Sequence, residues 1–409
     1  MVYDVTVIGG GPSGSQAAYR LAKRGHSVLV MEQKTSHQEP VCCTGIVSEQ
    51  CLKEFEIDER VVLRHSNSAS LFSPSGRLLR LERTTPQAAT LDRPAFNSFM
   101  SRRAIQCGAE YLFNTRAADV SRFQGRLSIT AATSDKTVKI ESRAVVLATG
   151  SSSFLSESTG FGKPGQVVSG AQTVVELDND AAEVSVYFGH KVAPGFFAWV
   201  VPTSQGRALA GLLAARNAKG RLAEFLDVLK DKGLVRGTVG EPISAPLPLK
   251  AMHRIYSDRA LVVGTAAGLV KPTTGGGIYY GLLSADIAAD VLHHGLAIGD
   301  LSGRIVGDYQ RLVLRALGGE LRAGLWGRRI FERLTDTQLD RAFDIMLEPG
   351  RVQMLMESQE VTFDRHSEAI AHLLRQRTLA KLINGTRFPF PGRHPAKERP
   401  FTKEIASDK

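Results

Sequence analysis

Residues 7–14, with the sequence Val7-Ile8-Gly9-Gly10-Gly11-Pro12-Ser13-Gly14, are the strongest indication of the fold of this chain. The apolar run that leads into it, residues 4–8, is typical of a buried strand. Residues 15–24 then predict a helix, and residues 27–31 predict a second strand. A glycine-rich turn between a strand and a helix predicts a dinucleotide-binding unit.

The spacing of this glycine loop assigns a physical role to each of its positions. Gly9 permits a tight turn, Gly11 lets the backbone approach a pyrophosphate, and Gly14 lets the helix pack closely on the strand. Pro12 and Ser13 fall at the helix start, where free N–H groups and the positive end of the helix dipole favour phosphates. We therefore expect all five residues to lie against the cofactor.

An acidic residue and a second glycine-rich segment indicate that this cofactor is long. Glu32 ends the second predicted strand and can accept hydrogen bonds from ribose hydroxyls. Residues 263–278 contain further glycine turns, and two such loops at the ends of the core indicate one molecule held twice, as in FAD enzymes. The expected FAD contacts here are Glu32, Gln33, Gly264, Thr265, Gly275, Gly276, Gly277 and Ile278, together with the strand end Ala148, Thr149 and Gly150.

Composition limits the class of protein. The chain has 409 residues, of which 43% are hydrophobic and 22% charged, and it is long enough for two or three domains. No apolar run approaches the roughly 18 residues that span a bilayer, and no secretory signal is evident, so we expect a cytoplasmic protein, with peripheral membrane contact as an alternative. Four cysteines do not make a disulfide framework, and the histidine spacing suggests no metal site.

The net charge of +10 favours an anionic partner such as a membrane surface, a phospholipid or a diphosphate. The alternative is a basic surface that binds no partner and only keeps the protein soluble. No nucleic-acid-binding module is evident, so nucleic acid is not expected.

The order of the expected elements predicts an α/β fold, α+β overall. It consists of a Rossmann-like FAD domain, an inserted antiparallel-sheet substrate domain and a helical C-terminal region. Strand-like runs occupy 184–188, 196–201 and 208–213, and a leucine stripe at Leu314, Leu317, Leu321 and Leu325 predicts a long helix. We assign the FAD domain to residues 1–65, 91–165 and 255–300, the substrate domain to 66–90 and 166–254, and the helical region to 301–409.

Three motifs resemble those of the geranylgeranyl reductase family, FAD flavoproteins of the glutathione-reductase-2 type with a para-hydroxybenzoate hydroxylase-like fold. The first is Cys42-Cys43-Thr44-Gly45-Ile46, and the second is Phe197-Ala-Trp199-Val-Val201-Pro202 followed by Gly211. The third runs from Asp258 to Gly277, with Thr265 where the family usually has an aspartate. The resemblance implies that Cys43, Thr44 and Gly45 lie near the flavin ring and that Arg93 touches the cofactor.

The resemblance also implies a reaction, the saturation of isolated double bonds in a polyprenyl lipid or diphosphate, a chlorophyll precursor or a quinone side chain. One alkene carbon receives a hydride from the reduced flavin and the other a proton, so cationic character develops on the way. Cys42 can supply the proton, and Trp199 can face the cation through its ring. The bland alternatives are a small buried residue for Cys42 and a pocket wall for Trp199. The expected pocket residues are Phe188, Phe196, Phe197 and Pro202.

Partners and competing functions stay open at this point. Only one dinucleotide-binding unit is present, so electrons come from NADPH that docks transiently, from ferredoxin or from another reductant. The C-terminal helices, with Leu325, Trp326, Ile330 and Phe331 beside Arg328 and Arg329, either rest on a membrane or form ordinary helical core. An FAD monooxygenase or halogenase of the same fold is the alternative enzyme, and a non-catalytic flavin or prenyl-lipid carrier is a third.

Overall fold

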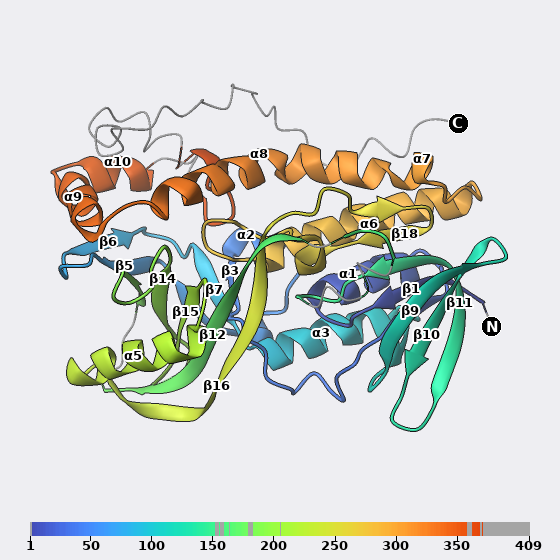
Figure 1. The fold of residues 1–409 in the computed structure, drawn as a ribbon, viewed down its shortest axis with the longest axis horizontal. Helices are drawn as coiled ribbons and strands as arrows, with labels where there is room; N and C mark the ends of the chain where they lie inside the picture. The colour runs from blue at the N-terminus through green and yellow to red at the C-terminus, as the bar shows by residue number, and fades with distance from the viewer. Residues whose placement is uncertain are drawn as a thin grey trace.

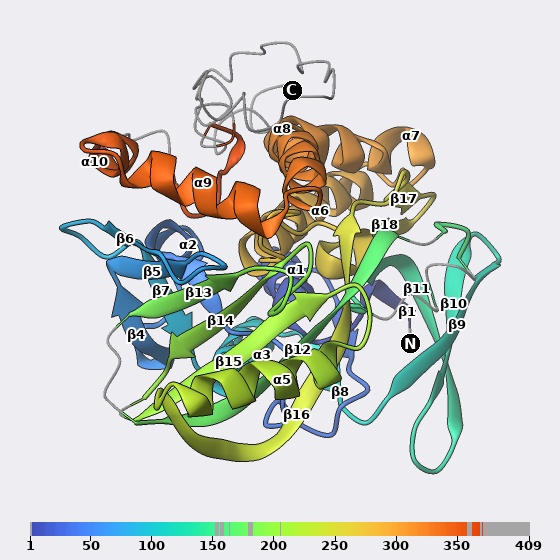
Figure 2. The ribbon, with the colours of Figure 1, turned by 60° about the vertical axis from the view of Figure 1, so that its left-hand side comes forward.

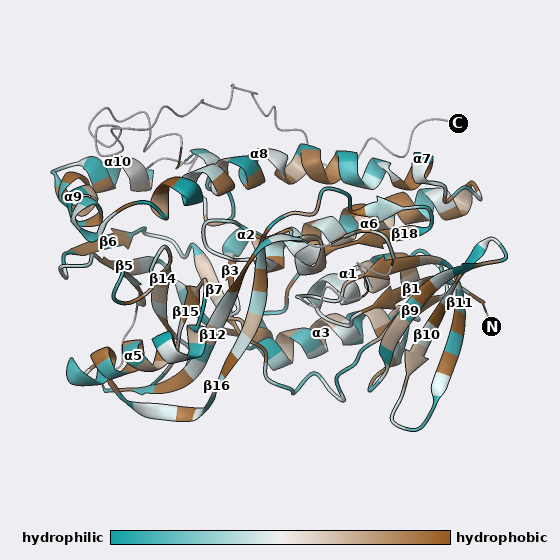
Figure 3. Cartoon of the chain, in the orientation of Figure 1, coloured by the Kyte–Doolittle hydropathy of each residue, from teal (hydrophilic) through white to brown (hydrophobic). Residues whose placement is uncertain are grey.

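The computed structural model describes residues 2–151, 155, 159–162, 164–178, 183–204, 206–357, 362–368 and 370 of the 409. Two large sheets lie next to each other, and the long helices α6 (Ile278–Ala297) and α8 (Asp308–Phe331) extend over them (Figure 1). Apolar residues gather on the central strands of both sheets, whereas α8 alternates between polar and apolar positions (Figure 3).

The first sheet is the dinucleotide-binding unit that the glycine loop predicts. Its main strand order is β17-β18-β11-β1-β2-β8, and β18, β11, β1, β2 and β8 pair in parallel. The strands are β1 (Val2–Ile8), β2 (Val28–Met31), β8 (Glu110–Leu112), β11 (Thr137–Leu147), β17 (Tyr256–Ser257) and β18 (Ala260–Val262). Helix α1 (Pro12–Ala22) packs against both α3 (Arg93–Gln106) and α6.

A hairpin extends this sheet on the β11 side. Strands β9 (Arg116–Phe123) and β10 (Arg126–Ala132) pair antiparallel, and β10 pairs antiparallel with the first half of β11. The sequence indicates only a polar, alternating stretch here, because one face of the hairpin is exposed and the apolar signal is correspondingly weak.

The second sheet has seven strands in the order β16-β12-β15-β14-β13-β5-β6. They are β5 (Ser68–Phe72), β6 (Leu78–Glu82), β12 (Gly165–Leu177), β13 (Val184–Phe188), β14 (Phe197–Pro202), β15 (Arg207–Ala214) and β16 (Val235–Lys250). Most neighbours are antiparallel as expected, but β13 pairs with β5 in parallel. Helix α5 (Ala218–Asp231) covers one face (Figure 2), with Leu222, Phe225 and Leu229 buried in the contact.

The stretch 66–90, expected to belong to one sheet, is divided between two. Strands β5 and β6 join the seven-stranded sheet, whereas β7 (Ala88–Leu91) pairs with β3 (Ile46–Ser48) and β4 (Val62–Ser66) in a small sheet of three strands. The short helices α2 (Glu49–Glu54) and η1 (Glu59–Val61) connect β3 to β4. Strand β3 begins at the last residue of the cysteine segment (residues 41–46), and β7 ends two residues before Arg93, so this small sheet fixes the chain next to both.

The described C-terminal part is helical, with α7 (Gly303–Val306), α9 (Asp336–Leu347) and α10 (Arg351–Glu357) flanking α8. The leucine stripe is only partly right: Leu317 and Leu321 are buried, but Leu314 is 49% exposed. The buried side of α8 continues from Leu317 to Val313 and Tyr309, four residues apart, which leaves Leu314 outside. Residues 371–409 of the expected helical region lie outside the described residues, and no described helix is both long and apolar enough to cross a bilayer.

Candidate active site

The glycines of the first loop differ in whether the surrounding structure has room for a side chain. A methyl group on Gly9 or Gly14 would collide with backbone, at Ala148 and Gly9 respectively, and Gly9 also has a φ of +107°. A methyl group on Gly11 would meet nothing within 4 Å among the described residues. Gly9 and Gly14 are therefore required by the strand–helix packing, and Gly11 leaves room for a ligand at the backbone.

The start of α1 has the chemistry of a phosphate site. Pro12 is its first residue, the cap residue is Gly11, and no described side chain hydrogen-bonds to this helix end as a cap. The first turn carries no acidic residue. Backbone N–H groups at an uncapped helix start need acceptors, and the dipole favours an anion there.

Glu32 supports the first glycine loop through its carboxylate. Its Oε2 accepts a hydrogen bond from Gly10 N at 2.7 Å, and its Oε1 accepts one from Lys34 N at 2.9 Å. Gln33 is exposed and lines a surface cavity of about 520 Å³ together with Lys34 and Arg116. The carboxylate thus holds the glycine loop and its lone pairs can accept further bonds from a ribose.

The two glycine-rich segments, far apart in sequence, are in direct contact. Strands β1, β11 and β18 run parallel, so Gly9, Ala148 and Gly264 follow strand ends at one edge of the sheet. A methyl group on Gly264 would lie 2.5 Å from Ser13 Oγ. This contact joins the start of α1 to the second segment, while Thr149 and Gly150 continue from the end of β11.

The second loop ends at another uncapped helix start. Gly275 N donates to Lys271 O at 2.8 Å and Lys271 N donates to Gly276 O at 2.9 Å, which closes the loop on itself. Ile278 begins α6, and its cap residue Gly277 has no side chain that could accept a bond from the N–H groups of the first turn. A methyl group on Gly277 would lie 3.3 Å from Thr265 Oγ1, so the threonine lies against this helix start.

Arg93 presents unsatisfied donors. Its Nη2 donates to Asn97 Oδ1 at 3.1 Å, but Nε and Nη1 are buried and have no hydrogen-bond partner among the described residues. Its side chain packs on the cysteine segment, since a methyl group on Gly45 would lie 3.1 Å from Arg93 Cδ. Buried guanidinium N–H groups without partners are costly, so this pair of donors fits an acceptor-rich ligand.

Cys42 lies between its own segment and the seven-stranded sheet. Its Sγ donates to Ile243 O of β16 at 3.5 Å, and a methyl group on Gly170 of β12 would lie 3.7 Å from the same sulfur. Burial, with a smaller contribution from Cys43, raises the pKa of the Cys42 thiol to about 11. The thiol is therefore protonated at neutral pH.

Trp199 belongs to a row that crosses three strands. Gln172 of β12 pairs with Gly211 of β15, and Gly211 pairs with Trp199 of β14. A methyl group on Gly211 would lie 2.7 Å from Gln172 Cβ and 2.6 Å from Trp199 Cζ2, so both side chains lean over the glycine. Trp199 Nε1 and Gln172 Oε1 are buried and have no partner in the described part of the chain.

Gln172 also holds the cysteine segment, because its Nε2 donates to Val41 O at 3.4 Å. This residue was not among those predicted from the sequence. A glutamine within the mostly apolar strand β12, with an exposed fraction of 4%, was the available signal.

The second glycine loop reaches the same face of the sheet. A methyl group on Gly275 would lie 2.6 Å from Leu247 Cδ2 and 3.2 Å from Leu213 Cδ1. Leu213 Cδ2 would in turn lie 3.4 Å from a methyl group on Gly170, the glycine beside Cys42. Leu213 therefore lies between the glycine loop and Gly170, so the loop and Cys42 approach the same part of the sheet.

The aromatic residues form a row, with one exception. Ring centroids lie 6.0 Å apart for Phe197 and Trp199, 6.1 Å for Phe188 and Phe197, and 5.8 Å for Phe188 and Phe331. Phe196 does not join them, because its buried ring lies under the guanidinium of Arg328 at 3.8 Å. Pro202 is buried at the end of β14.

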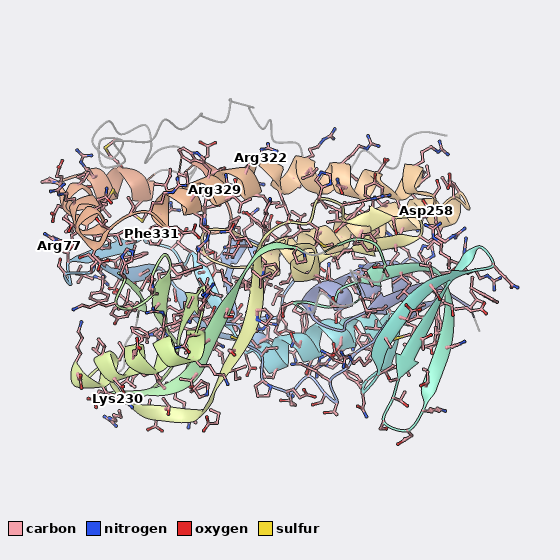
Figure 4. All side chains as sticks on the ribbon, viewed as in Figure 1. Arg77, Lys230, Asp258, Arg322, Arg329 and Phe331 are labelled. Carbon is pink, nitrogen blue, oxygen red and sulfur yellow. The ribbon has the colours of Figure 1, made fainter. Side chains whose placement is uncertain are left out.

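Two residues near the end of α8 that the sequence places at a possible membrane contact, Arg328 and Ile330, are buried in the protein. Arg328 is 3% exposed, covers Phe196 and forms an ion pair with Glu332 at 2.7 Å, and Ile330 is 8% exposed. Both face inward because this part of α8 packs on the loop before β14, where Arg328 Nη2 donates to Gly195 O. Arg322 and Arg329 are exposed; Figure 4 labels both, with Phe331 nearer β6.

Comparisons with known proteins place these features in a family context. The family model for pyridine nucleotide-disulphide oxidoreductases matches residues 3–186. The chain is 30% identical over 358 residues to the digeranylgeranylglycerophospholipid reductase of Methanocaldococcus jannaschii, covering 83% of this chain and 89% of that protein. It is 31% identical over 356 residues to digeranylgeranylglycerophospholipid reductase 2 of Methanothermobacter thermautotrophicus, covering 83% and 90%.

Solved structures share the fold. A geranylgeranyl bacteriochlorophyll reductase-like protein from Thermoplasma acidophilum matches with a TM-score of 0.82 and 24% identity over 93% of this chain and 99% of that one. A flavin-dependent brominase matches with a TM-score of 0.71 and 16% identity over 92% and 99%. These likenesses confirm the predicted Rossmann-like α/β fold.

Proposed function

Because the chain belongs to the geranylgeranyl reductase family of FAD flavoproteins, we propose that it saturates isolated carbon–carbon double bonds in geranylgeranyl chains. The protein is an FAD-dependent oxidoreductase, as the two glycine segments predict. The observation that carries the proposal is the position of the protonated Cys42 thiol beside Gly170, on the part of the sheet where Leu213 meets the glycine loop before α6.

Several features of the two glycine segments and of Arg93 suit FAD. The open backbone at Gly11 and the uncapped start of α1 suit the pyrophosphate, and Glu32 suits the adenosine ribose. The unsatisfied donors of Arg93 and the start of α6 suit the more polar edge of the flavin and its ribityl chain. The cofactor contacts that we carry forward from the sequence are therefore those of both glycine segments, of Arg93, and of Cys43, Thr44 and Gly45. Bound FAD, once reduced, supplies a hydride to one carbon of the alkene.

Cys42 supplies the proton that the other alkene carbon needs. An isolated alkene is a weak base, so a neutral acid must lie close and must keep its proton until the reaction. Burial keeps this thiol protonated, and its segment is held by the bond from Gln172 to Val41. Gln172 is thus a positioning residue for the acid.

Trp199 faces the developing positive charge. Its ring lies in the row over Gly211, and a cation beside an indole face is stabilised by roughly 0.5–2 kcal/mol. The amide oxygen of Gln172, which no described donor satisfies, adds a negative partial charge at the same row. Phe197 and Phe188 continue the apolar surface along which a polyprenyl tail is bound.

Two relatives support one substrate class, because they are named reductases of a digeranylgeranylglycerophospholipid. We assign the same class of lipid to this chain. A free geranylgeranyl diphosphate, a chlorophyll precursor and a quinone side chain are the alternatives that a lipid assay separates.

A lipid substrate requires access to a membrane, and α8 offers a basic surface for it. Arg315, Arg322 and Arg329 follow each other at intervals of seven residues and are all exposed, with exposed Leu314 next to the first. Such a stripe attracts anionic headgroups, at about 1 kcal/mol per basic residue near the surface. This face, rather than Arg328 and Ile330, is the peripheral membrane contact that we propose.

The test is mass spectrometry of lipids incubated with the FAD-loaded protein and dithionite in the absence of oxygen. Dithionite replaces the natural electron donor, and the candidates for that donor are NADPH, ferredoxin and other reductants. The phospholipid should gain two hydrogens for each double bond that is reduced. A smaller amount of free geranylgeranyl diphosphate should be converted. No gain on any polyprenyl compound, together with a product that gains oxygen when NADPH and air are supplied, would instead show a monooxygenase.

A further inference from the structure

A buried ion pair lies directly under the second glycine loop. Lys271 Nζ lies 3.0 Å from Asp364 Oδ1 and donates to Phe363 O at 2.8 Å. The side chains are 6% and 5% exposed, so both charges are inside the protein. Neither residue has a role in the proposed alkene chemistry.

The lysine belongs to the loop itself. Its backbone closes the loop through bonds with Gly275 and Gly276, and a methyl group on Gly276 would lie 2.7 Å from Lys271 Cε. The lysine side chain therefore runs beneath the glycines. Burial lowers the pKa of Lys271, and Asp364 opposes that change.

The aspartate belongs to a segment more than 90 residues farther along the chain, and other elements hold it. Its second oxygen accepts a hydrogen bond from Ser48 Oγ, the residue that caps α2, and Tyr280 of α6 donates to its backbone oxygen at 3.1 Å. Asp364 thus connects the loop to the start of α6 and to the end of β3.

Two neighbouring residues dock the same segment. Thr273 Oγ1 and His366 Nδ1 lie 2.6 Å apart, a second link to the glycine loop. His366 N and Ser367 N donate to Glu320 Oε2 of α8 at 2.8 and 2.9 Å. Residues 362–368 therefore bridge α8 and the loop.

Stability alone does not explain this arrangement. A buried ion pair often stabilises a fold no more than apolar residues of the same volume would, because both charges lose their hydration. Its directional bonds, however, allow only one relative placement of the groups that it joins. The joined groups here are the glycine loop and residues 362–368.

We propose that residues 362–368 are part of the FAD site: through Asp364 and Lys271 they hold the loop 271–277 in the shape that binds the flavin. Both are positioning residues, because they act through the loop and not on the reacting atoms. The inference concerns cofactor affinity, so it can fail while the proposed reaction stands, and the reverse also holds.

The first test compares two truncated proteins with the full chain. A chain ending at residue 361 lacks the segment, whereas a chain ending at residue 370 keeps it and loses only residues 371–409. We expect the Kd of FAD, measured by flavin fluorescence on the apoprotein, to rise at least about tenfold for the shorter chain and to stay within about twofold for the longer one. Equal Kd values for the shorter chain and the full chain would overturn the proposal.

The second test needs no truncation and covers the case in which the shorter chain does not fold. Asp364→Asn keeps the shape and removes the charge, and Asp340→Asn is the matched control. Asp340 accepts bonds from Ser73 and Ser75 on the turn before β6 and does not contact the loop. Only Asp364→Asn should raise the Kd of FAD, severalfold, and an unchanged Kd would contradict the proposal.

A third readout uses the reciprocity of coupled sites. If the segment holds the loop for FAD, then FAD must in turn hold the segment. Amide hydrogen exchange in residues 362–368 of the full chain should therefore slow when FAD is added, and exchange that is the same with and without FAD would count against the coupling.

Discussion

The Cys42 thiol donates to the carbonyl oxygen of Ile243, at 3.5 Å, and so joins the cysteine segment to strand β16. The two residues are 201 positions apart in the sequence. This contact places the proposed acid on the sheet that carries Trp199, on the face that meets the glycine loop before α6. The site is thus assembled by the packing of the seven-stranded sheet against the cofactor domain.

Removing the thiol should separate turnover from cofactor binding. Cys42→Ala is expected to lower the rate of alkene reduction by about 10²-fold or more, the scale of a lost general acid, while the Kd of FAD stays unchanged. Cys107→Ala is the control, because Cys107 lies at the end of α3. Full turnover by Cys42→Ala would remove this residue from the mechanism.

The pH dependence follows from the sign of the shift. Burial raises the pKa of the Cys42 thiol from 9.0 to about 11, so the folded protein keeps this proton when the unfolded chain has lost it. The contribution of Cys42 to the free energy of unfolding is fully present below pH 9 and decreases as the pH rises from 9 to 11. The rate of alkene reduction by the folded protein should be flat until the pH approaches about 11 and should fall there, and a decline that begins near pH 7 would point to another acid.

Two glycines of the first loop should respond differently to the same substitution. Gly14→Ala forces a methyl group into the backbone of Gly9 and should reduce the free energy of unfolding by roughly 1–3 kcal/mol or prevent folding. Gly11→Ala meets no described atom, so its melting temperature should stay close to that of the parent while the Kd of FAD rises by about tenfold. Thermal melting and FAD titration of both variants check this, and an unchanged Kd for Gly11→Ala would contradict the assigned phosphate site.

Gly211 should matter for the substrate and not for FAD. Gly211→Ala places a methyl group 2.6 Å from Trp199 Cζ2 and must displace the indole or Gln172. We expect a higher KM and a lower kcat for the polyprenyl lipid, with FAD affinity unchanged. Gly237→Ala on β16, where a methyl group meets nothing within 4 Å of the described residues, is the matched control.

Acid should loosen the C-terminal segment. Burial and the nearby Lys271 lower the pKa of His366 from 6.5 to about 4, although Phe363 O and Asp364 oppose the change. Between these two pH values His366 is protonated in the unfolded chain and neutral in the folded chain. The free energy of unfolding therefore decreases as the pH drops from 6.5 toward 4. His366→Gln should flatten this part of the stability profile, as measured by urea unfolding at several pH values.

The sequence predicts the parts of the site that depend on local geometry. Gly9, Gly14 and the strand ends could be assigned because a tight strand–helix turn requires glycine wherever it occurs. Gln172 and Asp364 could not, because their partners are 131 residues away at Val41 and 93 residues away at Lys271. The contact between Phe196 and Arg328 could not be predicted for the same reason, since only the fold brings these two residues together.

We propose that this FAD protein passes electrons to an isolated alkene of a geranylgeranyl lipid. This transfer can be observed directly if the FAD-loaded protein is reduced without oxygen, freed of excess reductant and mixed with the digeranylgeranyl phospholipid while the flavin absorbance is followed. We expect the oxidised flavin spectrum to return at a rate that depends on lipid concentration, and we expect the fully saturated lipid to have no such effect. A flavin that stays reduced in the presence of the unsaturated lipid, but reoxidises with air, would show that the transfer does not occur.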